Sequence, residues 1–402
     1  MHVPVWHEAT KDLQAAGKLQ MVGLIQEQHP DRARLFMQWK NMGWPILVDS
    51  YNLLGVQVVP ITLAIDEHGV IRQINPPRGD VELLERTFLS QDFDPPDPPG
   101  SVGPETPNLD ALRPASGSEN VDVWMAYADA LAVWGGREGR DEAIGAYTTA
   151  VRLNADDAMA RFRLGVAYRM RYDSDARQEG DFNRAVQHWS DALEINPNQY
   201  IFRRRIQQYG PRLDKPYSFY DWVNTARAEL EAEGETPSPL AIEPRGAEFA
   251  QPTRDFSAST APEEDPDPRG RVLRDEGPFI GIEVVAVPPV IDPGATARFH
   301  VVFRPVEENL SHWNNEAEEL GLWIDPPRGW EVERHYLTLP LPPQATSQET
   351  RILEVEVRAP ERRGSGVTTI PAYALYYVCE DVDGLCMYRR QDLELQVSVR
   401  GR

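Results

Sequence analysis

Two proline-rich stretches divide this chain and limit what it can fold into. Residues 91–119 and 231–277 contain many prolines and show no hydrophobic period. Segments of this composition bury too little apolar surface to offset the entropy of ordering them, so we expect them to be linkers. The chain is therefore predicted to be multidomain, with folded parts at residues 1–90, 120–230 and 278–402.

Composition excludes several classes of protein. The 402 residues carry a formal net charge of −22, so we expect no nucleic-acid partner. Apolar residues reach 41%, enough to fill folded cores, yet no apolar run approaches the length of a membrane-spanning helix. The two cysteines are too few for a disulfide scaffold or a four-cysteine zinc site, and no histidine has metal-ligand spacing. No cofactor or metal is predicted.

Residues 1–90 alternate helix and strand patterns. An apolar stripe with helical period predicts the first helix, and two further helices are expected after Pro30 and near Phe88. Short apolar runs between them predict strands at residues 19–26, 46–48, 56–65 and 70–74. This order predicts an α/β domain that ends in a hairpin and a helix.

The dipeptide Val59-Pro60 opens the third of these apolar runs. Its position and the element order resemble a thioredoxin-like domain of the TlpA/peroxiredoxin-like branch. The resemblance implies that Pro60 is cis and that the Val59 backbone faces the substrate; a proline that merely begins an edge strand is the alternative. In that family a strand and a Cys-X-X-Cys motif precede the first helix.

Residues 1–90 contain no cysteine, so this domain is expected to exchange no disulfides as it stands. The resemblance implies a domain that lacks its first strand and redox motif. We expect an upstream segment that supplies the strand, the dithiol and an export signal. A degenerate domain and an assembly partner that supplies the missing strand are the alternatives.

Two segments within residues 120–230 repeat one spacing of small and aromatic residues. The matching positions are Ala143, Tyr147, Ala150 and Ala155 in the first copy, and Ala185, Trp189, Ala192 and Pro197 in the second. Small residues at such spacings let helices approach closely, while the aromatic ring fills the remaining space. The pattern resembles about two tetratricopeptide repeats, which implies a groove that binds a protein client. Helices at 199–209 and 217–230 are expected to cap this stack.

Residues 278–402 alternate apolar and polar side chains with period two, as in Leu353, Val355 and Val357. Such runs, divided by proline and glycine turns, predict an all-β sandwich. Cys379 ends one run and Cys386 begins the next, with a turn carrying Asp383-Gly384 between them. A hairpin would bring both sulfurs within bonding distance and stabilise the fold by roughly 2.5 kcal/mol. A redox pair, a structural disulfide and two reduced thiols all stay open on spacing alone.

The same pair, together with Leu310–Asn314 and Pro326–Trp330, resembles the N-terminal domain of the thiol:disulfide interchange protein DsbD family. The resemblance implies an immunoglobulin-like sandwich whose cysteines pass electrons to periplasmic proteins through mixed disulfides. It also implies that Cys386 is the attacking sulfur and that Cys379 resolves the intermediate. The cysteine spacing is about one residue longer than the family pattern.

We therefore predict a thiol–disulfide exchange or electron relay protein of the periplasm or another extracytoplasmic compartment. Its partners would be protein clients or redox proteins, and if it is an enzyme it is a thiol–disulfide oxidoreductase. The alternative is a non-catalytic interaction or assembly protein whose thioredoxin-like and sandwich domains are redox-inert. No signal peptide is visible at the start of the chain.

Overall fold

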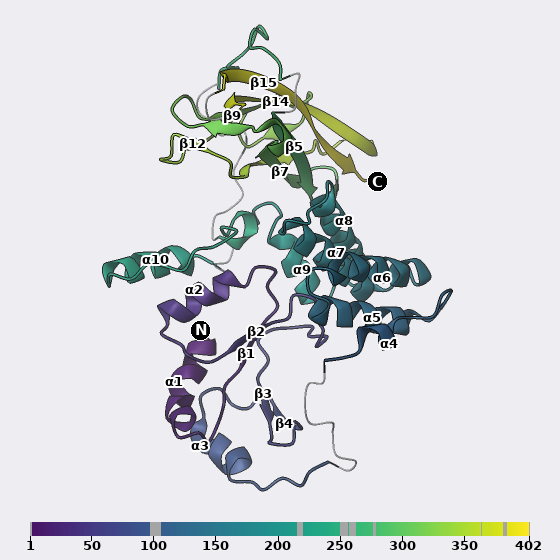
Figure 1. Cartoon of the computed structure of the whole chain (residues 1–402), viewed down its shortest axis with the longest axis vertical. Coiled ribbons are helices and arrows are strands. Elements are labelled where there is room, and N and C mark those ends of the chain that lie inside the picture. Colours follow the sequence, from purple (N-terminus) through teal and green to yellow (C-terminus); the bar gives the residue numbers. More distant parts are fainter. Residues whose placement is uncertain are drawn as a thin grey trace. The chain divides into compact units, whose positions relative to one another are not determined.

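The computed structural model describes residues 2–96, 106–214, 220–249, 256, 263–275, 279–362, 364–380 and 384–401. The remainder includes parts of both predicted linkers, Tyr217 of the last predicted helix, and Asp383 of the predicted turn. The chain contains both helices and many strands, as expected for a multidomain protein (Figure 1).

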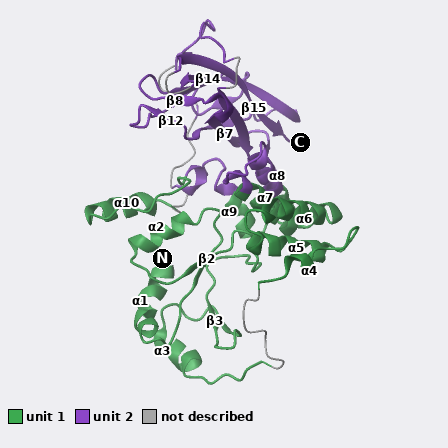
Figure 2. Ribbon diagram, viewed as in Figure 1, with its two compact units in different colours: residues 1–170, 191–205, 219–244 green, residues 171–190, 206–218, 245–402 purple. Residues whose placement is uncertain are grey.

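The chain divides into two compact units (Figure 2). Unit 1 comprises residues 1–170, 191–205 and 219–244, and unit 2 comprises residues 171–190, 206–218 and 245–402. The division passes through three helices: α7 (Ala158–Tyr172), α8 (Asp181–Ile195) and α9 (Tyr200–Gln207). The predicted helical domain at 120–230 thus contributes to both units, and its independence stays a prediction.

Unit 1 begins with the expected order of helices and strands. The elements are α1 (His2–Ala15), β1 (Gly23–Ile25), α2 (Asp31–Trp39), β2 (Ile46–Val48), β3 (Leu63–Ile65), β4 (Ile71–Ile74), α3 (Val81–Leu84) and the π-helical turn η1 (Glu85–Leu89). The strands are shorter than predicted. In the run at 56–65, for example, only the last three residues pair in a β-ladder. Trp6, Ala64, Leu84 and Phe88 belong to one small core that joins α1 to β3 and to the last helical turns.

The strands of unit 1 form two separate two-stranded sheets in the described part of the chain. β1 pairs with β2 in parallel, and β3 pairs with β4 in antiparallel fashion with an irregularity at Ala64 and Ile65. Isolated two-stranded ribbons bury little apolar surface by themselves. Their stability must therefore come from the helices that pack against them.

The helices that follow are α4 (Leu109–Leu112), α5 (Val121–Trp134), α6 (Gly139–Leu153), α7, α8, α9 and α10 (Trp222–Ala232). Asn120 caps α5, since its side chain accepts hydrogen bonds from the amides of Asp122 and Val123. The predicted repeat residues on α6 and α8 are fully buried, and they are Ala143, Tyr147, Ala150, Ala185, Trp189 and Ala192. Ala155 and Pro197, the last positions of the two repeats, are exposed. The small and aromatic residues of the pattern are therefore buried, as expected, and their assignment to tetratricopeptide repeats stays a prediction.

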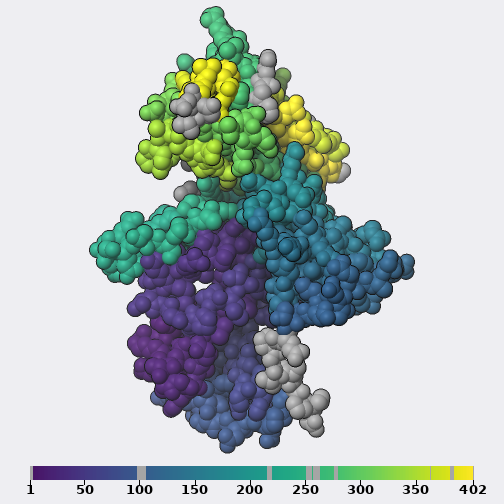
Figure 3. Space-filling view, in the orientation of Figure 1, coloured from purple at the N-terminus to yellow at the C-terminus, as the bar shows by residue number. Residues whose placement is uncertain are grey.

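The last two helices of unit 1 pack in different places. Phe202 on α9 stacks on Phe162 of α7 at 4.6 Å, as expected of a helix that continues the stack. In contrast, α10 packs on α2: Val223 and Ala226 share a core with Leu35. Figure 3 shows the green surface of α10 lying against the purple surface of the first residues. The prediction that 217–230 caps the helical stack is therefore wrong, because its apolar face pairs with α2.

Two buried arginines explain why helices and ribbons form one unit. Arg163 on α7 donates hydrogen bonds to the carbonyl groups of Tyr51 and Asn52, at 3.2 and 3.1 Å. Arg205 on α9 likewise donates to the carbonyl groups of Gln26 and Ser50. These carbonyl groups lie outside the β-ladders of the two-stranded sheets. The two guanidinium groups supply the hydrogen bonds that the ladders do not.

Unit 2 contains two sheets whose inner faces share one core. The first sheet has the order β10-β13-β7-β5, and the second the order β11-β9-β14-β15-β6, with β8 and β12 beside it. Their bounds are β5 (Ile280–Val287), β6 (Val290–Ile291), β7 (Thr296–Pro305), β8 (His312–Asn314), β9 (Leu320–Ile324), β10 (Glu331–Val332), β11 (Tyr336–Leu339), β12 (Thr346–Ser347), β13 (Arg351–Arg358), β14 (Gly366–Cys379) and β15 (Cys386–Val399). The short helical turns η2 (Gly246–Glu248) and η4 (Glu307–Asn309) lie in the connections. The predicted period-two alternation is confirmed, since Val355 and Val357 are fully buried.

The outer face of β7 and β13 carries a buried charged network. Arg298 forms ion pairs with Glu354 and Glu356, and His300 lies 3.0 Å from Glu354. The second ring nitrogen of His300 lies 2.8 Å from the carbonyl oxygen of Tyr209. His300 thus lies between a carboxylate and a carbonyl oxygen, both of which accept hydrogen bonds. The network holds residue 209 on the sheet of unit 2.

Candidate functional site

The site is built on one long hairpin. β14 and β15 pair in unbroken antiparallel register from Gly366 opposite Val399 to Cys379 opposite Cys386. The cysteines form the last pair of this ladder, with their Cα atoms 4.0 Å apart, and they are joined by a disulfide. The predicted pairing on a hairpin is confirmed, and the alternative of two reduced thiols does not describe this structure.

The disulfide lies on the face of the sheet turned away from the core. Tyr376 and Val378 are core residues, and side chains of a strand alternate between its faces. Cys379 therefore projects outward, together with Tyr377. The rings of Tyr377 and its register partner Tyr388 stack with centroids 4.5 Å apart, next to the disulfide on the same face. Burial raises the pKa of Tyr388 to about 12, so its hydroxyl group stays neutral at physiological pH.

The two cysteines differ in exposure. Cys379 is 1% exposed, whereas Cys386 is an exposed residue. Leu385, directly before Cys386, is 68% exposed, and Leu310 is 64% exposed. One half of the disulfide can thus be reached from solvent, and the exposed Leu385 is its neighbour in the chain.

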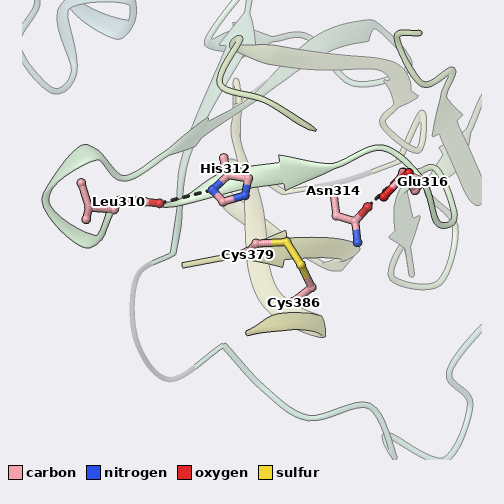
Figure 4. Close-up of a disulfide and its surroundings, with 6 residues drawn as sticks. All are labelled: Leu310, His312, Asn314, Glu316, Cys379 and Cys386. Carbon is pink, nitrogen blue, oxygen red and sulfur yellow. Dashed lines mark hydrogen bonds between the residues drawn. A yellow bond between two sulfur atoms is a disulfide. The ribbon is translucent and has the colours of Figure 1, made fainter. Parts of the chain in front are cut away.

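A third residue continues the row of cysteines across the sheet. β8 pairs with β14 so that His312 lies directly opposite Cys379 and Trp313 lies opposite Val378. Directly paired residues of antiparallel strands project to the same face, with Cβ atoms about 5 Å apart. His312, Cys379 and Cys386 therefore form one cross-strand row (Figure 4). His312 is 6% exposed.

Neighbouring contacts fix His312 in this row. Its Nδ1 lies 3.4 Å from the carbonyl oxygen of Leu310, a residue in left-handed conformation that ends η4. Trp313 is buried in the core, and its indole donates to the carbonyl group of Glu349 at 2.8 Å. Asn315 donates to the Gln344 carbonyl group, which ties the end of β8 to the following loop.

The other predicted site residues lie in unit 1. The Val59-Pro60 peptide bond is cis, which confirms that expectation. Val59 is 51% exposed and stands four residues before the start of β3, so its backbone is outside that ladder. Because residues 1–90 contain no cysteine, the predicted substrate-facing role of Val59 and Pro60 stays a prediction.

Sequence reasoning missed His312 as a member of the site. The histidines are scattered along the chain, and none has a spacing that indicates chemistry. The only signal was its place in Leu310–Asn314, the stretch that carried the DsbD resemblance. The strand pairing that brings it beside Cys379 joins residues 67 positions apart, from 312 to 379. No local pattern encodes such a pairing.

Two further classes of site were sought among the described residues. Within the described ranges, no group of three or more His, Cys, Asp or Glu side chains could hold a metal ion. None of the helices in those ranges is long and apolar enough to span a bilayer.

Comparisons with known proteins add little. No protein-family model matches the chain, and no curated protein matches it. A solved structure titled as AvmM, which catalyses macrocyclization in alchivemycin A biosynthesis, is 13% identical and covers 33% of this chain and 96% of its own, with a TM-score of 0.19. AggA, the major subunit of aggregative adherence fimbriae type I from Escherichia coli, is 11% identical and covers 32% of this chain and 98% of its own, with a TM-score of 0.18. Similarity at this level carries no argument about the fold or the function.

Proposed function

We propose that this protein exchanges thiols and disulfides with partner proteins through Cys379 and Cys386. The observation that carries this proposal is the asymmetry of the pair, because Cys386 is exposed while Cys379 is buried. Exchange needs one sulfur that a partner can reach and a second that stays protected until the mixed disulfide forms. A disulfide that only stabilised the hairpin would need neither an accessible sulfur nor a protected one.

The asymmetry assigns the order of steps. In the reduced protein the Cys386 thiolate attacks a partner disulfide, forms a mixed disulfide and releases the first partner thiolate. The Cys379 sulfur then attacks the Cys386 sulfur, re-forms the internal disulfide and releases the second partner thiolate. The partner is reduced by two electrons and this protein is oxidised. Attack by a partner thiolate on Cys386 runs the same steps in reverse.

The surface beside Cys386 supports a protein as the partner. Leu385, directly before Cys386, is 68% exposed, and the stacked Tyr377 and Tyr388 lie on the same face as the disulfide. Aromatic and apolar side chains around an accessible reactive group are typical of protein contact surfaces. We propose that a partner protein contacts these three residues when it forms the mixed disulfide.

We further propose the finer domain assignments that the resemblances imply. Unit 2 would contain an immunoglobulin-like sandwich of the DsbD N-terminal type, supported by two sheets around one core. Residues 1–90 would be thioredoxin-like, supported by the parallel β1–β2 pair and the cis proline before β3. Residues 120–230 would bind clients through tetratricopeptide repeats, supported by the buried repeat residues. A disulfide also fits an extracytoplasmic compartment such as the periplasm.

The reduction potential of the disulfide tests the proposal. We expect a value near −200 mV, typical of catalytic pairs, whereas a value far below ~−300 mV is typical of structural disulfides. A reduced Cys379→Ser variant should trap a mixed disulfide with a peptide disulfide, and a Cys386→Ser variant should trap none. Equal trapping by both variants, or a potential in the structural range, would reject the proposal.

One observation favours a second function, that of an assembly or interaction protein. The two ribbons of unit 1 expose apolar side chains on strands that have unpaired edges: Leu24, Leu47, Ile65, Ile71 and Ile74 are all at least 40% exposed. Such edges pair readily with an extended strand from another chain. We propose as the occupant an extended segment rich in β-branched apolar residues.

Hydrogen exchange tests this second function. The amides of β1 and β3 should exchange rapidly in the isolated chain and slowly once the partner strand has paired. A reduction potential in the catalytic range, with no change in amide hydrogen exchange when the partner is added, would favour thiol–disulfide exchange. Strong protection of these amides, together with a reduction potential in the range of structural disulfides, would favour the assembly function.

A further inference from the structure

The position of His312 points to a role in the second step of exchange, and this inference rests on the proposed function. The step that resolves a mixed disulfide needs a thiolate, but Cys379 is 1% exposed and out of reach of bulk water. A buried thiol in apolar surroundings holds its proton more tightly than a free one. A neighbouring base is therefore needed before Cys379 can attack.

His312 has the right neighbour and the right tautomer. It is the register partner of Cys379 and projects to the same face of the sheet (Figure 4). The carbonyl oxygen of Leu310 can only accept a hydrogen bond, so the Nδ1 that faces it carries the proton in the neutral ring. Nε2 then holds a lone pair, and Figure 4 shows this nitrogen on the side of the ring away from Leu310.

We propose that His312 Nε2 accepts the proton of the Cys379 thiol when Cys379 resolves the mixed disulfide. The Cys379 Sγ–H bond breaks, its proton moves to Nε2, and the sulfur attacks Cys386 Sγ. The bond between Cys386 and the partner sulfur breaks, and the electron pair leaves with the partner thiolate. In the reverse direction the imidazolium returns its proton to Cys379 as the internal disulfide opens.

A coloured aromatic disulfide, dithiobis(nitrobenzoate), separates the two steps in the reduced full-length chain. Attack by Cys386 releases one equivalent of coloured thiolate, and resolution by Cys379 releases a second. We expect His312→Gln and His312→Asn to leave the first phase unchanged and to slow the second about 10²-fold, the usual contribution of a positioned general base. Cys379→Ser identifies the phases, since it should abolish only the second.

His335→Gln is the matched control. His335 is another histidine of unit 2 whose Nδ1 lies 2.9 Å from a carbonyl oxygen, that of Ile324, but it is exposed and belongs to another strand connection. This variant should retain both phases. Added imidazole should restore the second phase of a His312→Gly variant, which a merely structural role would not explain.

The outcomes separate this inference from the proposed function. If both His312 variants resolve at the rate of the natural chain, or if imidazole restores nothing in a His312→Gly variant with native circular dichroism, the inference is overturned. If the natural chain itself never releases the second equivalent, Cys379 does not resolve mixed disulfides. In that case the proposed function fails, and the role of His312 fails with it.

Discussion

The ribbons of unit 1 and the sheets of unit 2 make opposite use of their apolar strand residues. Ile65 and Ile74 of the β3–β4 ribbon are 51% and 69% exposed, whereas Phe299 and Val355 of the unit 2 sheets are fully buried. The long strands of unit 2 alternate apolar and polar side chains, whereas β1, β2 and β3 are short apolar runs. The difference lies in what covers the apolar face: a second sheet in unit 2, and only short helices in unit 1.

This contrast teaches that apolar strand residues predict a strand but not the burial of its side chains. A strand with period two presents one apolar side, but burial needs a second layer of matching size. Parallel strands in particular are normally covered on both faces, and the β1–β2 pair leaves Leu24 and Leu47 exposed. Unit 1 is therefore the part of the molecule where another chain segment would gain most by binding.

The largest expected effect comes from the unit 2 core. Replacing Phe299 with alanine removes a fully buried ring between the two sheets and should lower the free energy of unfolding by about 3–5 kcal/mol. Guanidinium denaturation followed by tryptophan fluorescence would measure this change. A loss below about 1 kcal/mol would contradict the single close-packed core described for unit 2.

A loss of about 3 kcal/mol is expected from Glu354→Gln, because the buried Arg298 would keep only its ion pair with Glu356 and His300 would lose its carboxylate neighbour. Burial by itself raises the pKa of Glu354, but Arg298 and His300 outweigh it and hold this pKa well below 4.5. A carboxyl with a lowered native pKa stabilises the fold above its unfolded pKa. That contribution is therefore lost as the pH falls below about 4.5 towards the native pKa.

Unfolding at a series of acidic pH values would measure this effect. The natural chain should lose stability in that range, and the Glu354→Gln variant should lose less of it. Glu331→Gln is a suitable control, since the Glu331 carboxylate pairs with Arg358 at the surface. Identical acid profiles for the natural chain and Glu354→Gln would contradict the network.

An intermediate effect is expected from the disulfide itself. Reduction reopens a loop of only a few residues, so unit 2 should lose roughly 2.5 kcal/mol and should stay folded. Denaturation with and without a reductant would measure the loss. Complete unfolding of unit 2 on reduction would indicate a structural disulfide. That result would favour the redox-inert alternative over the proposed thiol–disulfide exchange.

The smallest effect is expected in unit 1. Ile74→Ser should change the free energy of unfolding by less than about 0.5 kcal/mol, because the Ile74 side chain is 69% exposed. Ile74→Ser should also weaken the binding of any strand that covers the ribbon. The free energy of unfolding lost through this substitution should therefore be larger when such a partner is bound. Calorimetry of the isolated chain would measure the first value. A loss of several kcal/mol without a partner would show that the ribbon is already covered.

Much of the local structure could be predicted from local patterns. The element order of residues 1–90 and the hairpin pairing of Cys379 with Cys386 depend on neighbours in the chain, whereas the cis bond before Pro60 was expected only from the thioredoxin-like resemblance. The packing of α10 on α2 was predicted wrongly, because an apolar helical stripe does not reveal which other stripe it will meet.

By itself the sequence determined where strands and helices form and which cysteines meet, because turns, prolines and apolar periods act over a few residues. Only the tertiary structure decided that Cys379 is buried while Cys386 is exposed, and that His312 lies opposite Cys379. Strand register between distant segments is set by the packing of Trp313 and Val378 in a common core. The reactive face of this protein follows from that packing, since a shift of one residue would turn His312 inward.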